Sequence, residues 1–226
     1  MTTNFVDGVT NTTESTTLGG FLAPDPSVAH VWFDDFDTFT AADWTVTETQ
    51  AGATQAVVAG DGGILALTNS AADDDLNAIQ WANETFKFEA GKRLWFKSRF
   101  KVSDATQSDL VIGLQITDAT PLAVSDGLYF AKADGSTSLS LVVTKNSTAT
   151  TTTGVATLAS NTYVTVGFVY DGASRVDIFV NDVRVKSSVT TNLCDDEELT
   201  LSIAVQNGEA AAKTLSVDYV FVAKER

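Results

Sequence analysis

The chain has 226 residues, of which 44% are hydrophobic, and a formal net charge of −15 at pH 7. Phosphate backbones and anionic lipids repel so acidic a chain, which excludes nucleic acid and membrane surfaces as expected partners. Helix signals are scarce, whereas Thr, Val, Ser, Gly, Asp and Asn recur throughout. This composition favours an all-β protein with room for one large β-sandwich.

The first 29 residues differ in composition from the rest. Thr, Asn, Ser and Gly dominate, so this segment cannot bury enough apolar surface to fold alone. It ends in Pro24-Asp25-Pro26, whose two prolines enforce an extended course. We therefore expect residues 1–29 to form an extended N-terminal arm that binds its own domain or a neighbouring subunit. Its apolar anchors, and hence its candidate partner-binding residues, are Phe5, Val6, Leu18, Phe21 and Leu22.

The charge is unevenly distributed along the chain. Thirteen acids precede the first basic residue, Lys87, whereas the remainder carries sixteen acids against fourteen bases. The excess of acid keeps the protein soluble. Alternatively, the acidic first third faces a basic partner surface.

From residue 30 onward, turn signals at short intervals separate alternating segments. Residues 30–36 predict a strand with an aromatic core face, and the turn at 60–63 leads into a strand at 64–67. The clearest alternation lies at 93–102. One of its faces carries Leu94, Phe96, Ser98, Phe100 and Val102. The other carries Arg93, Trp95, Lys97, Arg99 and Lys101.

Later segments continue the pattern. Residues 110–116 are apolar on both faces, which predicts a central strand, and the Thr-rich stretch at 146–153 predicts a surface loop or loose edge. In the hairpin at 168–186 the Asn181-Asp182 turn sets the register. Its expected packing residues are Val176, Ile178, Val180, Val183 and Val185. About a dozen strands are expected in residues 30–226, which favours a two-sheet antiparallel β-sandwich over a small barrel.

Catalytic patterns are missing. Glycoside hydrolysis requires two carboxyl groups roughly 5–10 Å apart, but the Glu-x-Asp-x-x-Glu pattern of sandwich glucanases is absent. Asp35 and Asp37 lie two residues apart, in what reads as an exposed strand end. There is no Gly-x-Ser-x-Gly sequence and no glycine-rich phosphate loop. We therefore expect no catalytic residues and a protein that is not an enzyme.

Metal and thiol chemistry have little support. Acids at 73–75 and 195–198 could offer calcium oxygen ligands, the first run being favoured, but neither has EF-hand spacing. His30 and Cys194 are the only soft ligands, which excludes zinc. We expect no cofactor and no metal-binding residue. Cys194 has no partner for an internal disulfide, and the acids that follow it should raise its thiol pKa and make it unreactive.

The N-terminus shows neither a basic region nor an apolar leader, and no apolar run reaches about twenty residues. We therefore expect a protein made in a cytoplasm without a signal peptide. It either stays there or leaves as part of a particle.

Trp95 is notable because it lies on the charged face of its strand. It could pack against neighbouring aliphatic stems, or it could be a hot spot for a protein partner or a sugar ring. Arg93, Trp95, Lys97 and Arg99 belong to the densest basic stripe of the chain and are candidate partner-binding residues. The stripe could receive the acidic arm of a neighbouring copy.

Residues 85–187 resemble the concanavalin A-like, laminin-G-like jelly-roll family, through the stretches at 92–101, 126–132 and 170–185. The whole chain resembles a group of tailed-phage virion proteins. The resemblance is carried by the Pro-Asp-Pro end of the arm, a Phe-Asp-Asp-Phe strand, a Gly-Asp-Gly-Gly turn and the block at 102–109.

This second resemblance implies a capsid decoration (cement) protein, located on the virion surface. It would bind the outer face of the major capsid protein lattice as a homotrimer, with arms that bridge neighbouring subunits. The alternative is a lectin-like carbohydrate-binding module on the virion surface or tail. A glycoside hydrolase is the third hypothesis, weakened by the missing carboxylate pattern.

Overall fold

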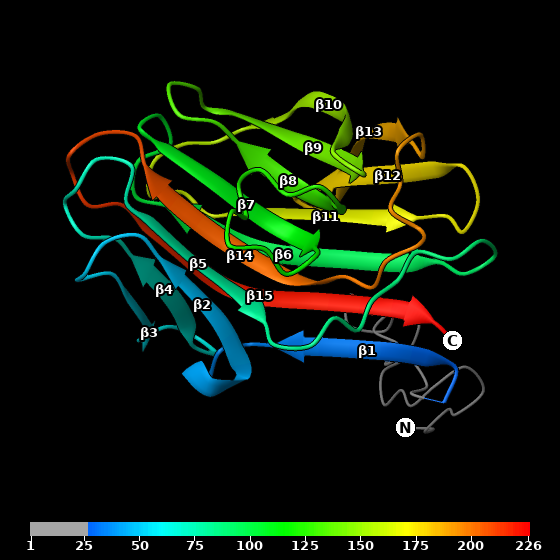
Figure 1. Ribbon diagram of the computed structural model, residues 1–226, viewed down its shortest axis with the longest axis horizontal. Helices are drawn as coiled ribbons and strands as arrows, with labels where there is room; N and C mark the ends of the chain where they lie inside the picture. Colours follow the sequence, from blue (N-terminus) through cyan, green and yellow to red (C-terminus); the bar gives the residue numbers. More distant parts are fainter. Residues whose placement is uncertain (1–26) are drawn as a thin grey trace, which may run out of the picture.

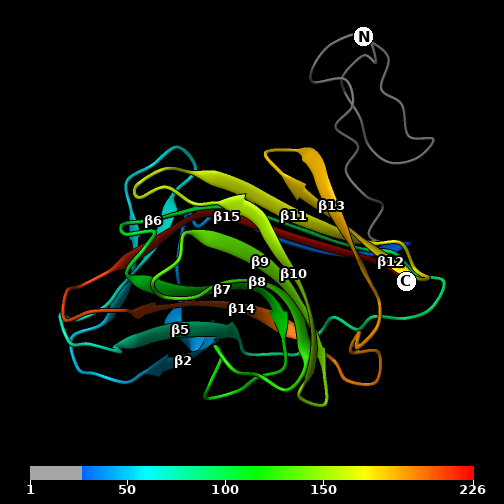
Figure 2. The ribbon, with the colours of Figure 1, turned by 90° about the horizontal axis from the view of Figure 1, so that it is seen from above.

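The computed structural model describes residues 27–226, which form two antiparallel β-sheets packed face to face (Figures 1 and 2). The described residues contain fifteen strands and one short 3-10 helix, η1 (Ala41–Asp43). An all-β sandwich of two antiparallel sheets confirms the predicted fold class. The predicted boundary between arm and sandwich stays a prediction, because residues 1–26 lie outside the described residues.

The first sheet has eight strands, in the order β13-β12-β11-β6-β15-β4-β3, and β1 also pairs with β15. Its strands are β1 (Ala29–Asp34), β3 (Thr54–Val58), β4 (Ile64–Thr68), β6 (Leu94–Val102), β11 (Val164–Tyr170), β12 (Arg175–Val180), β13 (Val183–Val189) and β15 (Thr214–Glu225). The described chain enters and leaves through the adjacent strands β1 and β15, where the Arg226 amide donates to the Val28 carbonyl at 3.0 Å.

The second sheet has seven strands, in the order β10-β9-β8-β7-β14-β5-β2. They are β2 (Trp44–Glu48), β5 (Leu76–Trp81), β7 (Ser108–Gln115), β8 (Gly127–Lys132), β9 (Ser138–Lys145), β10 (Thr148–Thr157) and β14 (Thr200–Asn207). The central position of β7 confirms the prediction made from its two apolar faces. The Thr-rich stretch forms most of β10, an edge strand, which matches the predicted loose edge.

The core lies between the sheets and follows from the alternation of the strands. Burial alternates strictly along β6, with the apolar residues of the predicted face inside. Phe96 of β6 stacks on Phe168 of β11 with ring centroids 5.0 Å apart, and Phe130 of β8 approaches both from the opposite sheet. Three tryptophans close one border of the sandwich in mutual edge contact: Trp32 of β1, Trp44 of β2 and Trp81 of β5.

The middle of the outer face of the seven-stranded sheet is covered by the chain itself. The segment 116–126, between β7 and β8, contributes Val124 and Leu122 to a second apolar cluster with Val111 and Tyr129. Gln80 of β5 holds the start of this segment through its side chain. Its Nε2 donates to the Ile116 carbonyl at 3.0 Å, and its Oε1 accepts from the Asp118 backbone amide at 2.9 Å. The segment therefore blocks ligand access to the middle of this face.

Two details of the sequence prediction are wrong. Val183 and Val185 are exposed rather than packed, because β13 is the edge strand of its sheet and Ser188 is its one buried residue. The aromatic face of β1 is also divided. Trp32 faces the core, whereas Phe33 is 57% exposed on the outer face.

No helix in residues 27–226 is long and apolar enough to cross a membrane.

Candidate functional site

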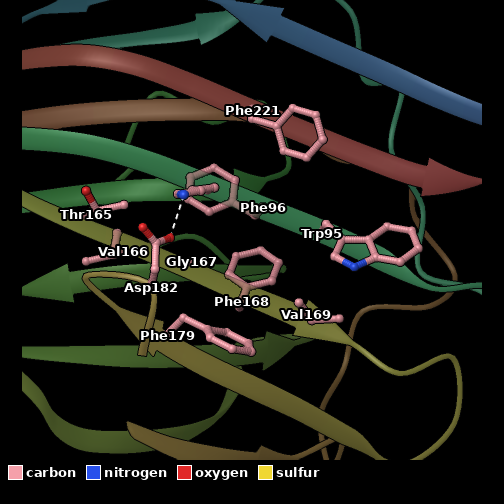
Figure 3. Close-up of a pocket in the computed structure, with 11 residues that line it drawn as sticks. Trp95, Phe96, Thr165, Val166, Gly167, Phe168, Val169, Phe179, Asp182 and Phe221 are labelled. Atoms are coloured by element: carbon pink, nitrogen blue, oxygen red, sulfur yellow. Dashed lines mark ion pairs between the residues drawn. The ribbon is translucent and has the colours of Figure 1, made fainter. Parts of the chain in front are cut away.

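An apolar hollow lies on the outer face of the eight-stranded sheet, over β6, β11, β12 and β15 (Figure 3). Strand register explains its position. Phe221 of β15, Lys97 of β6, Gly167 of β11 and Phe179 of β12 are successive partners in one row across the sheet. A glycine among large side chains leaves a depression, whose volume is about 180 Å³.

Gly167 is required at the floor of the hollow. A Cβ atom there would lie 2.8 Å from the carbonyl oxygen of Phe96 on the neighbouring strand, closer than real Cβ atoms approach. A larger side chain would therefore both displace backbone and fill the depression.

Three partly buried aromatic rings surround the floor. Phe179 and Phe221 stand on either side in the same row, and Trp95 stands in the adjacent row, where it pairs with Val169 of β11. Figure 3 shows the rings of Phe221, Trp95 and Phe179 arranged around the depression. Their placement gives the hollow apolar walls that remain open to solvent.

One polar feature stands at the end of the hollow away from Trp95. The Lys97 ammonium lies 2.5 Å from Oδ1 of Asp182, the dashed contact in Figure 3. Burial alone would lower the pKa of Lys97, but the hydrogen bond to Asp182 and the proximity of Tyr219 outweigh it, so this pKa is raised. The ammonium therefore stays charged through the physiological range.

The hairpin turn places Asp182 at this position. Asn181 and Asp182 both have positive φ, 49° and 63°, as a two-residue type I′ turn requires. The Asn181 amide donates to the Thr165 carbonyl of β11 at 2.8 Å, so the tip of the hairpin is fastened beside the hollow.

The structure brings together only part of the predicted basic stripe. Trp95 and Lys97 line the hollow, whereas Arg93 lies just before β6, where its backbone amide donates to the Glu225 carboxylate at 2.7 Å. Arg99 forms an ion pair with Asp218, and its guanidinium lies 4.1 Å from the centre of the Tyr163 ring. The arm anchors Phe5, Val6, Leu18, Phe21 and Leu22 lie outside the described residues.

In the acidic run at 73–75, Asp75 has a structural role. The buried Asp75 accepts hydrogen bonds from the Thr49 hydroxyl at 3.2 Å and from the Ser70 amide at 2.6 Å, so its carboxylate is turned into the protein. Burial, and then the nearby charges of Asp218, Asp37 and Asp61, raise the pKa of Asp35. In residues 27–226, the one group of three potential metal ligands that converge is Asp126, Cys194 and Asp196.

Cys194 is buried and its pKa is raised to about 12. The sequence prediction of an unreactive thiol rested on neighbouring acids. The larger cause is burial, and Asp126 and Asp196 add to it.

Comparison with solved structures shows similarity at the level of the fold. No protein-family model and no curated protein matches the chain. An endo-1,3-beta-glucanase from Streptomyces sioyaensis is similar with a TM-score of 0.64 and 14% identity, over 91% of this chain and 99% of that one. An endo-beta-1,4-glucuronan lyase from the fungus Trichoderma reesei is similar with a TM-score of 0.57 and 12% identity, over 84% and 94%. The carbohydrate recognition domain of Emp47p is similar with a TM-score of 0.60 and 11% identity, over 88% and 98%.

These neighbours correct the prediction that the protein is not an enzyme. The missing Glu-x-Asp-x-x-Glu pattern was its basis, but a glucanase and a lyase share the whole fold, as do lectin-like domains. The absence of one motif therefore does not exclude catalysis. The concanavalin A-like part of the predicted resemblance is supported, whereas none of these structures is a virion protein, so capsid decoration receives no support from them.

The sequence missed four residues of the hollow: Gly167, Phe179, Asp182 and Phe221. The sequence signal that could have found the two phenylalanines was the alternation of side chains between the two faces of a strand. Phe179 and Phe221 alternate with buried valines and isoleucine on their strands, and this places both rings on the face opposite the core.

Proposed function

We propose that the protein binds carbohydrate through the aromatic hollow on the outer face of the eight-stranded sheet. The observation that carries the proposal is the combination of Trp95, Phe179 and Phe221 around a glycine floor, with the Lys97–Asp182 ion pair at one end. The similarity to a carbohydrate recognition domain and to sugar-cleaving enzymes supports it at the level of the fold.

The chemistry of the hollow suits a sugar ring. The C–H faces of a pyranose pack against aromatic rings, which present apolar area with little conformational freedom to lose. Lys97 offers ammonium donors and Asp182 offers carboxylate acceptors, so together they can bond hydroxyl groups that both donate and accept. Binding sites commonly combine apolar walls with a few placed polar groups in this way.

The size of the hollow sets the expected strength. At about 180 Å³ it is well below the roughly 300 Å³ at which pockets for drug-sized ligands begin. We therefore expect one sugar ring to be held per protein, with weak affinity. Repeated rings or clustered copies would strengthen binding through effective concentration.

A glycan array tests the proposal, since its dense display compensates for weak binding. The wild-type protein should bind a defined set of glycans saturably, and Trp95→Ala and Phe179→Ala should each abolish this signal. Phe33→Ala is the matched control, because Phe33 is an exposed aromatic on the same sheet face outside the hollow. Binding that survives both hollow variants, or no glycan bound at all, would overturn the proposal. Release of reducing ends from the bound glycans should be measured in parallel.

A further inference from the structure

We propose that the sugar bound in the hollow is a uronic acid, whose carboxylate pairs with two arginines at the border of the hollow. This inference rests on the proposed carbohydrate binding and names the class of sugar. The arginines are Arg175, the first residue of β12, and Arg184 of β13. Neither of them lines the hollow itself.

Strand register places this pair beside the hollow. Trp95, Val169 and Asp177 are successive partners in one row of the outer face, and Phe179 pairs with Arg184. Trp95, Val169 and Phe179 line the hollow. Asp177 and Arg184 therefore each stand one strand beyond a residue of its lining, about 4.8 Å further across the sheet.

Two guanidinium groups share one carboxylate at this border. Arg175 Nε lies 3.0 Å and Arg184 Nη2 lies 2.6 Å from the same oxygen, Oδ1 of Asp177. The Asp177 side chain is 17% exposed, whereas those of the two arginines are 50% and 48% exposed. The next acid, Asp171, directs its carboxylate to three backbone amides of its own turn, between 2.9 and 3.1 Å away. The three ion-paired side chains therefore carry one positive charge in excess, and it lies open to solvent.

This arrangement suits a carboxylate on a sugar ring. A guanidinium group has five N–H donors in a planar fork that matches the two oxygens of a carboxylate. In a uronic acid the carboxylate projects from the edge of the ring, so the ring faces stay available to Trp95, Phe179 and Phe221. Asp177 belongs to the row of Trp95, at the end of the hollow away from Asp182. A carboxylate that points to this end meets the two arginines and avoids Asp182.

The net charge of −15 does not prevent this contact. At physiological ionic strength the screening length is about 8 Å, so acids further away repel the carboxylate only weakly. The guanidinium groups would touch it, and hydrogen bonds to ionised partners are roughly twice as strong as those between neutral groups. The local excess of positive charge therefore decides the preference.

A pair of glycosides tests the inference. Methyl β-D-glucuronide and methyl β-D-glucopyranoside share one ring and differ in a single substituent, a carboxylate in the first and a hydroxymethyl group in the second. Each is titrated into the 15N-labelled full-length protein at neutral pH, and the NMR shift of the Gly167 amide reports occupancy of the floor. The glucuronide should bind with a Kd about fivefold lower than the glucoside. This difference should shrink as salt is added.

Two matched variants isolate the contribution of the arginine. Arg184→Gln removes one guanidinium and leaves Arg175 neutralised by Asp177, so the Kd values of the two glycosides should become equal. Lys186→Gln, the control, removes a charge of the same sign from the same strand. The Lys186 ammonium donates to the Thr153 carbonyl of β10 at 2.6 Å and lies outside the hollow, so this variant should keep the full preference.

Equal Kd values in the wild type, or a preference that Arg184→Gln retains, would overturn this inference and leave the proposed carbohydrate binding standing. A preference lost equally in Lys186→Gln would also overturn it, since overall charge would then be the cause. If neither glycoside shifts the Gly167 amide, the proposed function fails and this inference fails with it.

Discussion

The two outer faces of the sandwich are built from the same kind of strand, yet they differ in the exposure of their apolar side chains. On the seven-stranded sheet, segment 116–126 covers Val111 and Tyr129 and turns them into a second apolar cluster. On the eight-stranded sheet, Trp95 and Phe179 remain partly exposed around a glycine floor. The first face stabilises the fold, whereas within residues 27–226 no segment covers the hollow of the second.

This difference has a simple energetic meaning. A ring buried under a covering segment gains its hydrophobic free energy during folding, whereas a partly exposed ring keeps some of that gain for a ligand. Substitutions on the two faces should therefore separate loss of stability from loss of binding.

The largest expected effect is on the covered face. Tyr129→Ala should lower the free energy of unfolding by about 3 kcal/mol, because it removes a buried ring and leaves a cavity. Phe179→Ala on the open face should cost about 1 kcal/mol or less. Urea denaturation of both variants measures the gap, and equal losses would contradict the division between the faces.

A smaller loss of stability is expected from releasing segment 116–126, which covers the first face. Gln80→Ala removes both hydrogen bonds that hold Ile116 and Asp118, and should cost about 1–3 kcal/mol because those backbone groups lose their partners. Hydrogen exchange at the Asp118 amide should become faster, while glycan binding at the opposite face stays unchanged. An unaltered exchange rate at Asp118 would show that other contacts hold the segment.

The Lys97–Asp182 ion pair should contribute less to the free energy of unfolding. Asp182→Asn should cost at most about 1 kcal/mol at neutral pH, since the Lys97 and Asp182 side chains are 38% and 73% exposed. The folded pKa of Lys97 is raised above 10.5, so its contribution is complete below that value and disappears as pH rises through the folded pKa. Urea titrations between pH 9 and 11.5 should show this loss in the wild type and a smaller loss in Asp182→Asn.

The smallest effect on stability is expected at the border between the sheets, outside both outer faces. His30, the single histidine of the chain, stacks on Phe86 with ring centroids 4.6 Å apart. Burial, and then the charges of Arg226 and Lys224, lower its pKa below 6.5. The unfolded chain therefore takes up the proton first, and stability should fall as pH drops through 6.5 and level off below the folded pKa.

Proton NMR of the single imidazole measures the His30 pKa directly. In His30→Phe, the decrease in stability between pH 7.5 and 5.5 should be reduced by the part that the imidazole contributes. A folded pKa at or above 6.5 would contradict the assignment of His30 as a partly buried group whose neutral form is favoured.

The sequence was sufficient for the fold class and for two of the six residues that define the hollow. Alternation along residues 93–102 placed Trp95 and Lys97 on an outer face, because side-chain parity on a strand is a local property. The rest of the hollow depends on register between strands that are distant in the chain. Nothing local states that Gly167 stands beside Lys97, or that Phe221 faces the same depression.

Local reasoning also failed at the edge of the sheet. Val183 and Val185 are exposed because β13 is an edge strand with one buried residue, Ser188, although their alternation resembles that of a packed strand. The order of strands in the sheet decides which strand lies at an edge, and the alternation along residues 183–189 does not reveal it.

The three tryptophans at the border of the sandwich give the molecule two separate optical reporters. Trp32, Trp44 and Trp81 are in edge contact with one another, so their coupled near-ultraviolet circular dichroism reports whether the sheets are closed. Trp95 stands apart from them in the wall of the hollow. Trp32 and Trp81 are partly buried like Trp95. The fluorescence quenching by acrylamide that is lost in Trp95→Phe is therefore the part due to Trp95, and shielding of that part would report whatever occupies the open face.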